Sequence, residues 1–284
     1  MAMSASALKL DPGSETAARG ATAVANPKFL LELIVADLHW SALQIGSLTL
    51  MSAAASTRGS TVELRFCRHL VYDDTRVMRL ALRYGGDAGL GEDIRGKLDR
   101  LYADIGEAMK PLASFVQSRS MTAGQRDQVQ RVLPVLRKVA QAASDCLAGL
   151  EGVTRSALNR DYGEDSVVIR KFLERAARGD LADIDSSGVL VAPRLKQRRQ
   201  SPRAKVSRSC RLVLSAGEFP AEIVDASREG LGLVCNAPLA QGDTVTVLVD
   251  GRQLAATVKR IDGSQIGLLL KQSLPLGDPL FMGG

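Results

Sequence analysis

The spacing of apolar residues changes once along this chain of 284 residues, and the change separates two kinds of structure. Between residues 29 and 178, apolar residues recur every three or four positions, as on one face of an α-helix. Between residues 206 and 272 they alternate at every second position, as on one face of a β-strand. We therefore predict an α+β protein of two domains, an N-terminal all-α helical bundle followed by an antiparallel β-barrel.

Composition sets the boundaries of these units. The first 26 residues are rich in Ala, Ser, Thr and Gly without a continuous apolar core, so we expect residues 1–28 to form a disordered leader. The helical bundle then covers residues 29–178. Residues 179–197 lose the periodicity and contain Gly and Pro, which predicts a linker. The β-barrel covers residues 198–284.

The helical half contains two apolar seams with alternating steps of three and four residues, at 94–115 and 129–150. This spacing is typical of two helices packed along their length. Pro111 and Pro134 lie within the seams, and a proline inside a helix kinks it, so we predict a short bent bundle rather than a straight coiled coil. With a further amphipathic helix at 166–177 we expect four or five helices. Residues 60–84 fit a helix or a strand, and we interpret them as helical.

The most apolar stretch of the chain, residues 29–56, is a possible membrane span. Its first half carries Glu32, Asp37 and His39, and the rest contains Ser, Thr and Gln. Because a spanning helix needs about 20 predominantly apolar residues, we predict that this stretch does not cross a membrane. We therefore expect the protein to be cytoplasmic.

The β half contains six short runs rich in Val, Ile and Leu that are separated by turn residues. Six strands in such a short segment predict a small antiparallel barrel. Asp250-Gly251 lies between two of the runs and is a strong hairpin signal, and Asp262-Gly263 repeats it. The predicted strands cover residues 207–215, 219–225, 230–236, 243–249, 253–261 and 265–271.

Positive charge is concentrated in one segment. Between Asp185 and Glu218 there are eight Lys and Arg residues and no acid, and without these eight the net charge falls from +6 to −2. The segment should attract anions. A general nucleic-acid binder would instead be expected to have a whole face that is basic. We predict no specific nucleic-acid binding, and we expect residues 186–205 to be mobile without a ligand because their charges repel one another.

Metal and catalytic sites have little support in the sequence. The four cysteines are far apart, and His39 and His69, the only histidines, lack a second histidine at ligand spacing. Both histidines lie in the helical half, and no nucleophile with a base and an orienting partner is recognisable. We therefore predict no metal site, no catalytic residues, no cofactor and no enzymatic activity.

Two polar clusters in the β half point to a ligand. The first is Gln197-Arg198-Arg199, followed by Arg203 four residues later, and the second is Asp225-x-Ser227-x-x-Gly230. An arginine fork suits both phosphate oxygens and the O6 and N7 edge of guanine. An Asp accepts hydrogen bonds from the N1 and N2 donors of guanine, and Gly230 allows close approach. The alternative is that the second cluster only forms a turn into Gly230.

These two clusters, at their separation of about twenty residues and within six predicted strands, resemble the PilZ domain, the bacterial receptor module for cyclic di-GMP. The resemblance covers about residues 196–272. It implies that Arg199 and Arg203 contact guanine edges and phosphates, with Arg198 as an additional contact. It also implies guanine and phosphate contacts from Asp225 and Ser227, with Gly230 making room. The family often adds a C-terminal helix, whereas residues 274–284 here have no helical pattern.

The resemblance predicts a cyclic di-GMP receptor in which ligand binding orders the basic linker and changes how the helical half meets an unidentified protein partner or a second copy of the chain. The paired seams of the helical half are consistent with a homodimer. The alternative is a structural or adaptor protein whose barrel is a protein-binding surface that binds no nucleotide.

Overall fold

The structure is a computed structural model, and the features below belong to the residues that it describes. These residues are 26–58, 82, 86, 89–115, 123–158, 160–186, 189–196, 202–275 and 278–281.

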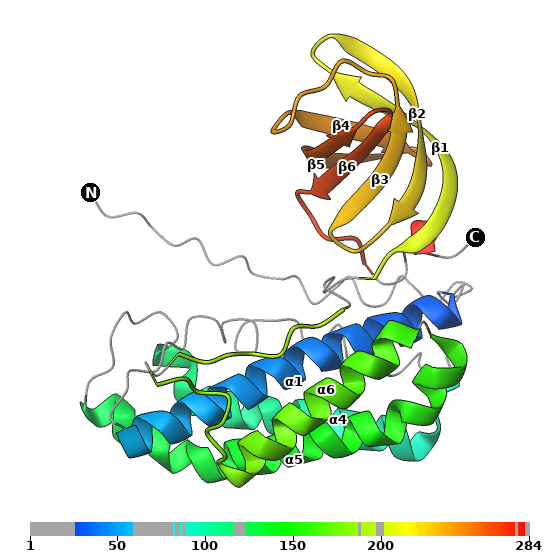
Figure 1. The fold of residues 1–284 in the computed structure, drawn as a ribbon. Coiled ribbons are helices and arrows are strands. Elements are labelled where there is room, and N and C mark those ends of the chain that lie inside the picture. Colours follow the sequence, from blue (N-terminus) through cyan, green and yellow to red (C-terminus); the bar gives the residue numbers. More distant parts are fainter. Residues whose placement is uncertain are drawn as a thin grey trace, which may run out of the picture.

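The N-terminal half is helical and the C-terminal half is a closed six-stranded barrel, which confirms the predicted fold class (Figure 1). The residues predicted as helical at 60–84 lie outside the described part of the chain except for Leu82. Four α-helices are described in the N-terminal half: α1 (Pro27–Arg58), α4 (Glu92–Met109), α5 (Ala123–Ala157) and α6 (Arg160–Arg178).

The two predicted seams lie on α4 and α5, and their buried residues belong to one hydrophobic core. The α-helical part of the first seam ends at Met109, and the chain continues as the 3-10 helix η3 (Lys110–Phe115), which contains Pro111. A proline removes a helical hydrogen bond, which explains why the α-helix ends there. By contrast, α5 continues through Pro134. Every residue of the second seam is buried: Val129, Val132, Leu136, Val139, Ala143, Cys146 and Leu150.

Helix α1 is buried on almost all sides, against α5 and α6 in particular. Its segment Pro27–Ala54 has the length and apolar composition of a membrane span, which buried core helices of globular proteins share. In the structure 83% of an 18-residue window of this segment is buried inside the protein. A helix that is mostly apolar on all its faces is expected either in a membrane or in the interior of a protein, and α1 is buried in the protein.

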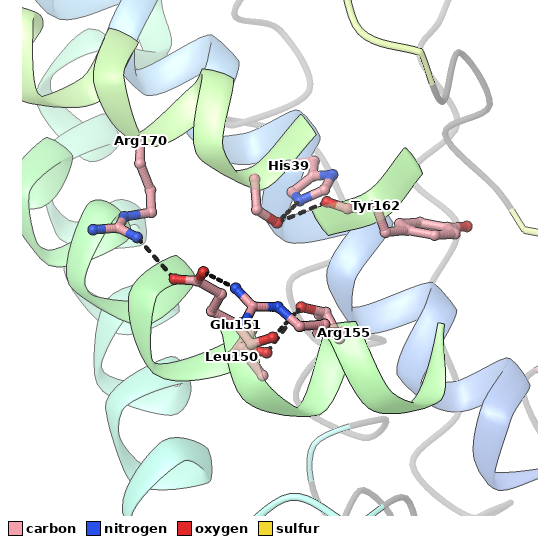
Figure 2. A network of polar contacts seen from close by, with 8 residues as sticks. His39, Leu150, Glu151, Arg155, Tyr162 and Arg170 are labelled. Atoms are coloured by element: carbon pink, nitrogen blue, oxygen red, sulfur yellow. Dashed lines mark hydrogen bonds and ion pairs between the residues drawn. The ribbon is translucent and has the colours of Figure 1, made fainter. Parts of the chain in front are cut away.

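A polar contact joins α1 to α6 inside the bundle (Figure 2). Ser166 Oγ donates to the carbonyl oxygen of Tyr162 at 2.9 Å and lies 2.8 Å from His39 Nε2. Because the serine has one proton to donate, His39 donates from Nε2 to the serine oxygen. Burial lowers the pKa of His39 to about 4, so the imidazole is neutral near neutral pH.

Ion pairs tie α5 to α6 at the surface of the bundle (Figure 2). Glu151 of α5 accepts from Arg155 one turn later at 2.6 Å and from Arg170 of α6 at 3.3 Å. One carboxylate therefore links the two helices. Exposed pairs of this kind contribute little to stability, typically about 0 to 1 kcal/mol each.

The linker packs along the bundle rather than running free (Figure 1). Leu181, Ile184 and Leu190 join an apolar cluster with residues of α1 and α6 that include Leu50 and Phe172. The spacing of these three residues follows neither the helical nor the strand period, so their burial was not recognisable from the sequence. Contact with two helices nevertheless buries Ile184 and shields part of Leu181 and Leu190 from water.

Polar contacts hold the linker at both ends. Near its start, Arg175 of α6 donates two hydrogen bonds to Asp183, at 2.8 and 3.0 Å. Near its end, the backbone N–H of Lys196 donates to the buried carboxylate of Asp165 at 2.9 Å, and the Lys196 ammonium pairs with Glu164. Residues 189–196 thus reach the end of the bundle attached to α6. The expected mobility of residues 186–205 without a ligand stays a prediction.

The barrel closes in the strand order β1-β2-β3-β6-β5-β4, with every neighbouring pair antiparallel. All six predicted strands are present. Their bounds are β1 (Ala204–Leu214), β2 (Gly217–Ala226), β3 (Gly230–Cys235), β4 (Thr244–Val249), β5 (Arg252–Asp262) and β6 (Gln265–Leu270).

The two predicted hairpin turns differ in type. Asp250 and Gly251 both have positive φ, 49° and 73°, as the predicted tight turn requires. In the second hairpin Asp262 pairs with Gln265, so the two-residue loop is Gly263-Ser264. Only Gly263 has positive φ there, at 58°, which fits a type II′ turn with glycine first. The prediction of Asp262-Gly263 as the loop was therefore one residue early.

The C-terminal segment connects the barrel to the start of α1. Asp278 accepts two hydrogen bonds from Arg252 of β5, at 2.6 and 3.1 Å. The following 3-10 helix η4 (Pro279–Phe281) places Phe281 against Phe29 of α1, with ring centroids 4.8 Å apart. The backbone N–H of Asn26 also donates to the Phe281 carbonyl at 3.3 Å. A segment without a helical pattern thus bridges the two halves.

We predict that Gly46→Ala destabilises the bundle. A Cβ at Gly46 of α1 would lie 2.5 Å from the ring of Phe172, which is fully buried in α6. The added methyl must displace this ring, and overpacking of this kind costs about 1 to 3 kcal/mol. The measurement is urea denaturation followed by the circular dichroism of the helices.

The matched control is Gly96→Ala in α4, where a Cβ would meet nothing within 4 Å. Alanine is a better helix former than glycine, so this control should raise the free energy of unfolding by up to about 1 kcal/mol. An equal gain for Gly46→Ala would contradict the tight contact between α1 and α6.

Candidate functional site

A pocket of about 670 Å³ lies at one side of the barrel and is the candidate ligand site. We name it the barrel pocket. Its wall is formed by residues of β1, β2, β3, β5 and β6 and by one side chain from the helical half, Trp40 of α1. Four of the six predicted site residues line it: Arg203, Asp225, Ser227 and Gly230. The other two, Arg198 and Arg199, lie outside the described residues.

An ion pair between Arg203 and Asp225 joins the two sequence clusters. Arg203 Nη1 donates to Asp225 Oδ1 at 2.5 Å, and both side chains are largely buried. Arg203 comes just before β1, and Asp225 of β2 faces Lys205 across the strands. Residues two apart on a strand share a face, so Arg203 and Asp225 form a diagonal cross-strand pair.

Ser227 forms the turn between β2 and β3. Its Oγ accepts from the backbone N–H of Gly230 at 3.1 Å, and its own backbone N–H donates to the Gly230 carbonyl at 2.8 Å. The side chain is buried. The turn interpretation that the sequence left open therefore describes Ser227 in this structure, whereas Asp225 is held by Arg203 instead.

Two glycines of β3 shape the floor of the pocket. A Cβ at Gly230 would lie 2.6 Å from the backbone oxygen of Leu268 in β6, so only glycine fits there. A Cβ at Gly232 would lie 2.6 Å from Asp225 Oδ1, so the absence of a side chain leaves room for this carboxylate. Sequence reasoning singled out Gly230 and missed Gly232. The signal that could have identified Gly232 is its spacing, because residues two apart in a strand lie on the same face and Gly230 was already assigned to the site.

Charges of both signs surround the pocket. Arg203 is neutralised by Asp225, and Arg260 pairs with Asp262 at 2.5 Å. Lys205 and Lys259 also line it and form no ion pair with a described residue. The pocket can therefore attract an anion through the two lysines, while its arginines are already oriented by carboxylates.

Sequence reasoning did not identify these other lining residues. Lys205 is one of the eight cations of the basic segment but was not assigned to the site, and Lys259 and Arg260 appear in the sequence as ordinary polar residues of a strand. Trp40 lies in a different predicted domain, far from the motifs in sequence, so no local pattern connected it with them. As for metals, no cluster of three or more His, Cys, Asp or Glu side chains suited to an ion occurs in the described part of the chain.

The C-terminal half is thus a small closed antiparallel barrel, and the two sequence clusters meet at the pocket on one side of it. Residues 197–278 match the family model of the PilZ domain, which confirms the resemblance found in the sequence. The match contains the whole barrel and all six predicted site residues, and it begins after the helical half. PilZ domains form a family of cyclic di-GMP receptors. A comparison with curated proteins found no match.

We predict that Gly230→Ala destabilises the barrel by about 1 to 3 kcal/mol, because the new methyl would press against the backbone of β6, which cannot rotate away. The measurement is the free energy of unfolding from chemical denaturation.

Gly267→Ala in β6 is the control. There the nearest atom to a new Cβ is the Arg260 Cβ at 3.5 Å, an ordinary contact. This variant should be unchanged or more stable by up to about 1 kcal/mol, since alanine has less conformational freedom to lose than glycine. Equal losses in both variants would show that the close approach at Gly230 is not specific.

Proposed function

We propose that this protein is a non-catalytic receptor for cyclic di-GMP and that the barrel pocket is its binding site. The observation that carries the proposal is the Arg203–Asp225 pair in the pocket, within the segment that matches the PilZ domain. It joins the two sequence clusters at one place and provides both a guanidinium and a carboxylate.

The chemistry of the pair suits a guanine nucleotide. The guanidinium has five N–H donors, and the hydrogen bond to Asp225 occupies one of them. The remaining donors of Arg203 can bind phosphate oxygens or the O6 and N7 atoms of guanine. The free oxygen lone pairs of Asp225 can accept from guanine N1 and N2. Lys205 and Lys259 add positive charge for a ligand with two phosphates.

We propose that Arg198 and Arg199 complete the site, as the resemblance to the family implies. The segment that carries them runs between Lys196, which is held by Asp165 of α6, and Arg203, which is held by Asp225 of β2. A ligand bound by this segment therefore acts on a piece of chain attached at one end to the bundle and at the other end to the barrel. This connection supports the proposed effect of ligand on the helical half and its partner, or on a homodimer.

We predict that Arg203→Ala and Arg199→Ala each weaken binding of cyclic di-GMP by about 5- to 150-fold, because each loses an arginine contact worth roughly 1 to 3 kcal/mol. Isothermal titration calorimetry measures this directly. Asp225→Ala should reduce the preference for cyclic di-GMP over cyclic di-AMP more than it reduces overall phosphate attraction.

Arg211→Ala is the matched control, since Arg211 is an exposed β1 arginine that pairs with Glu218 and is not among the residues lining the pocket. It should bind like the parent. Equal losses for Arg211 and Arg203, with a steep dependence on salt, would indicate general anion binding instead. A parent protein that does not bind cyclic di-GMP would favour the adaptor alternative.

We further predict that saturating cyclic di-GMP slows amide exchange over residues 197–203 and over the start of α6, because the ligand would fix the segment that Lys196 connects to Asp165. In Asp165→Ala the slowing at α6 should be lost while that at 197–203 remains. Exchange at 197–203 that does not change with ligand would rule out ordering of this segment.

A further inference from the structure

We infer that Trp40 of the helical half is part of the ligand site and stacks on a guanine of the bound dinucleotide, an inference that rests on the proposed function. Trp40 lines the barrel pocket together with Arg203, Asp225 and the backbone of β3 and β6. It is the only aromatic side chain among the described residues that line this pocket.

The position of Trp40 on α1 differs from that of its sequence neighbours. His39 and Ser41 are buried, with 3% and 8% of their surface exposed, and His39 contacts α6. Trp40 is half-buried, like Asp37 and Leu43 three residues before and after it. These three residues form a partly exposed stripe, because residues three apart lie on the same side of a helix. The indole at the middle of the stripe reaches the pocket.

Apart from Trp40, the described residues that line the pocket provide aliphatic and polar side chains but no aromatic ring. The described polar groups that line it, including Arg203 and Asp225, can bind base edges and phosphates. A base also presents a flat apolar face, and stacking of an aromatic side chain on that face favours binding by about 5- to 150-fold per base, the equivalent of 1 to 3 kcal/mol. Trp40 supplies such a surface. The volume of about 670 Å³ lies within the range of ordinary ligand pockets.

Contacts elsewhere hold α1 near the barrel. Phe29 stacks on Phe281 of the C-terminal segment, which Arg252 of β5 holds through Asp278. Trp40 follows Phe29 by eleven residues, or about 16 Å along the helix. Helix α1 therefore meets the barrel unit at two points, the Phe281 contact and the pocket.

The consequence concerns signalling. A ligand that contacts Trp40 directly touches helix α1 of the bundle as well as the barrel. The helical half would then sense occupancy through α1, in addition to any effect through the linker and α6.

The chain offers a direct probe, because Trp40 is its single tryptophan and all tryptophan fluorescence comes from it. Titration of the full-length parent with cyclic di-GMP should quench or shift this fluorescence, saturating at the affinity found by calorimetry. Trp40→Leu should weaken binding by about 5- to 150-fold, the loss of one stacked base. Trp40→Phe, which keeps an aromatic ring, should retain most of the affinity.

Leu43→Ala is the matched control, since it trims another residue of the same partly exposed stripe without lining the pocket. It should bind like the parent, and circular dichroism checks the fold of each variant. Two results would overturn the inference and leave the proposed function intact. One is calorimetric binding by the parent without a change in tryptophan fluorescence, and the other is a folded Trp40→Leu variant that binds with the affinity of the parent. A parent that shows no calorimetric binding would overturn both.

Discussion

Helix α1 has to be covered over most of its surface, and the rest of the molecule is arranged to do so. Most of its residues are buried and apolar, so exposure of these side chains to water would be unfavourable. Helices α5 and α6 cover much of it, and the linker adds Leu181, Ile184 and Leu190 over Leu50. Phe281 of the C-terminal segment covers Phe29 near its start. The segments that connect the two halves thus also help to bury this helix.

This arrangement places the motif segment between fixed points. Lys196 is bound to Asp165 on α6, and Arg203 is bound to Asp225 on β2. In the barrel, the turn at Ser227 and the glycines at 230 and 232 leave the Asp225 carboxylate accessible from the pocket. Carboxylates that orient arginines before a ligand arrives reduce the entropy lost on binding, because the guanidinium is already fixed. The geometry is therefore suited to an anionic ligand with hydrogen-bonding edges.

Much of the fold was predictable because it depends on local patterns. The six strands were located within a few residues, since alternating burial and turn residues are dictated by neighbouring positions. The second seam is buried as its spacing predicts, and so are Leu98, Leu101, Ile105, Ala108 and Leu112 of the first. The hairpin loop at Gly263-Ser264 was misplaced by one residue because both Asp-Gly and Gly-Ser satisfy the same local signal, and cross-strand pairing selects between them.

The amino-acid sequence by itself determined the two folding units, the strand pattern and the motif residues Arg203, Asp225, Ser227 and Gly230, because periodicity and motif spacing are properties of nearby residues. Only the tertiary structure decided that Ser227 holds a turn while Asp225 holds Arg203. It also decided that the linker lies on α1 and α6, and that Trp40 reaches a pocket formed by residues more than 160 positions later. Contacts over such separations depend on how whole elements pack, and no local pattern specifies that packing.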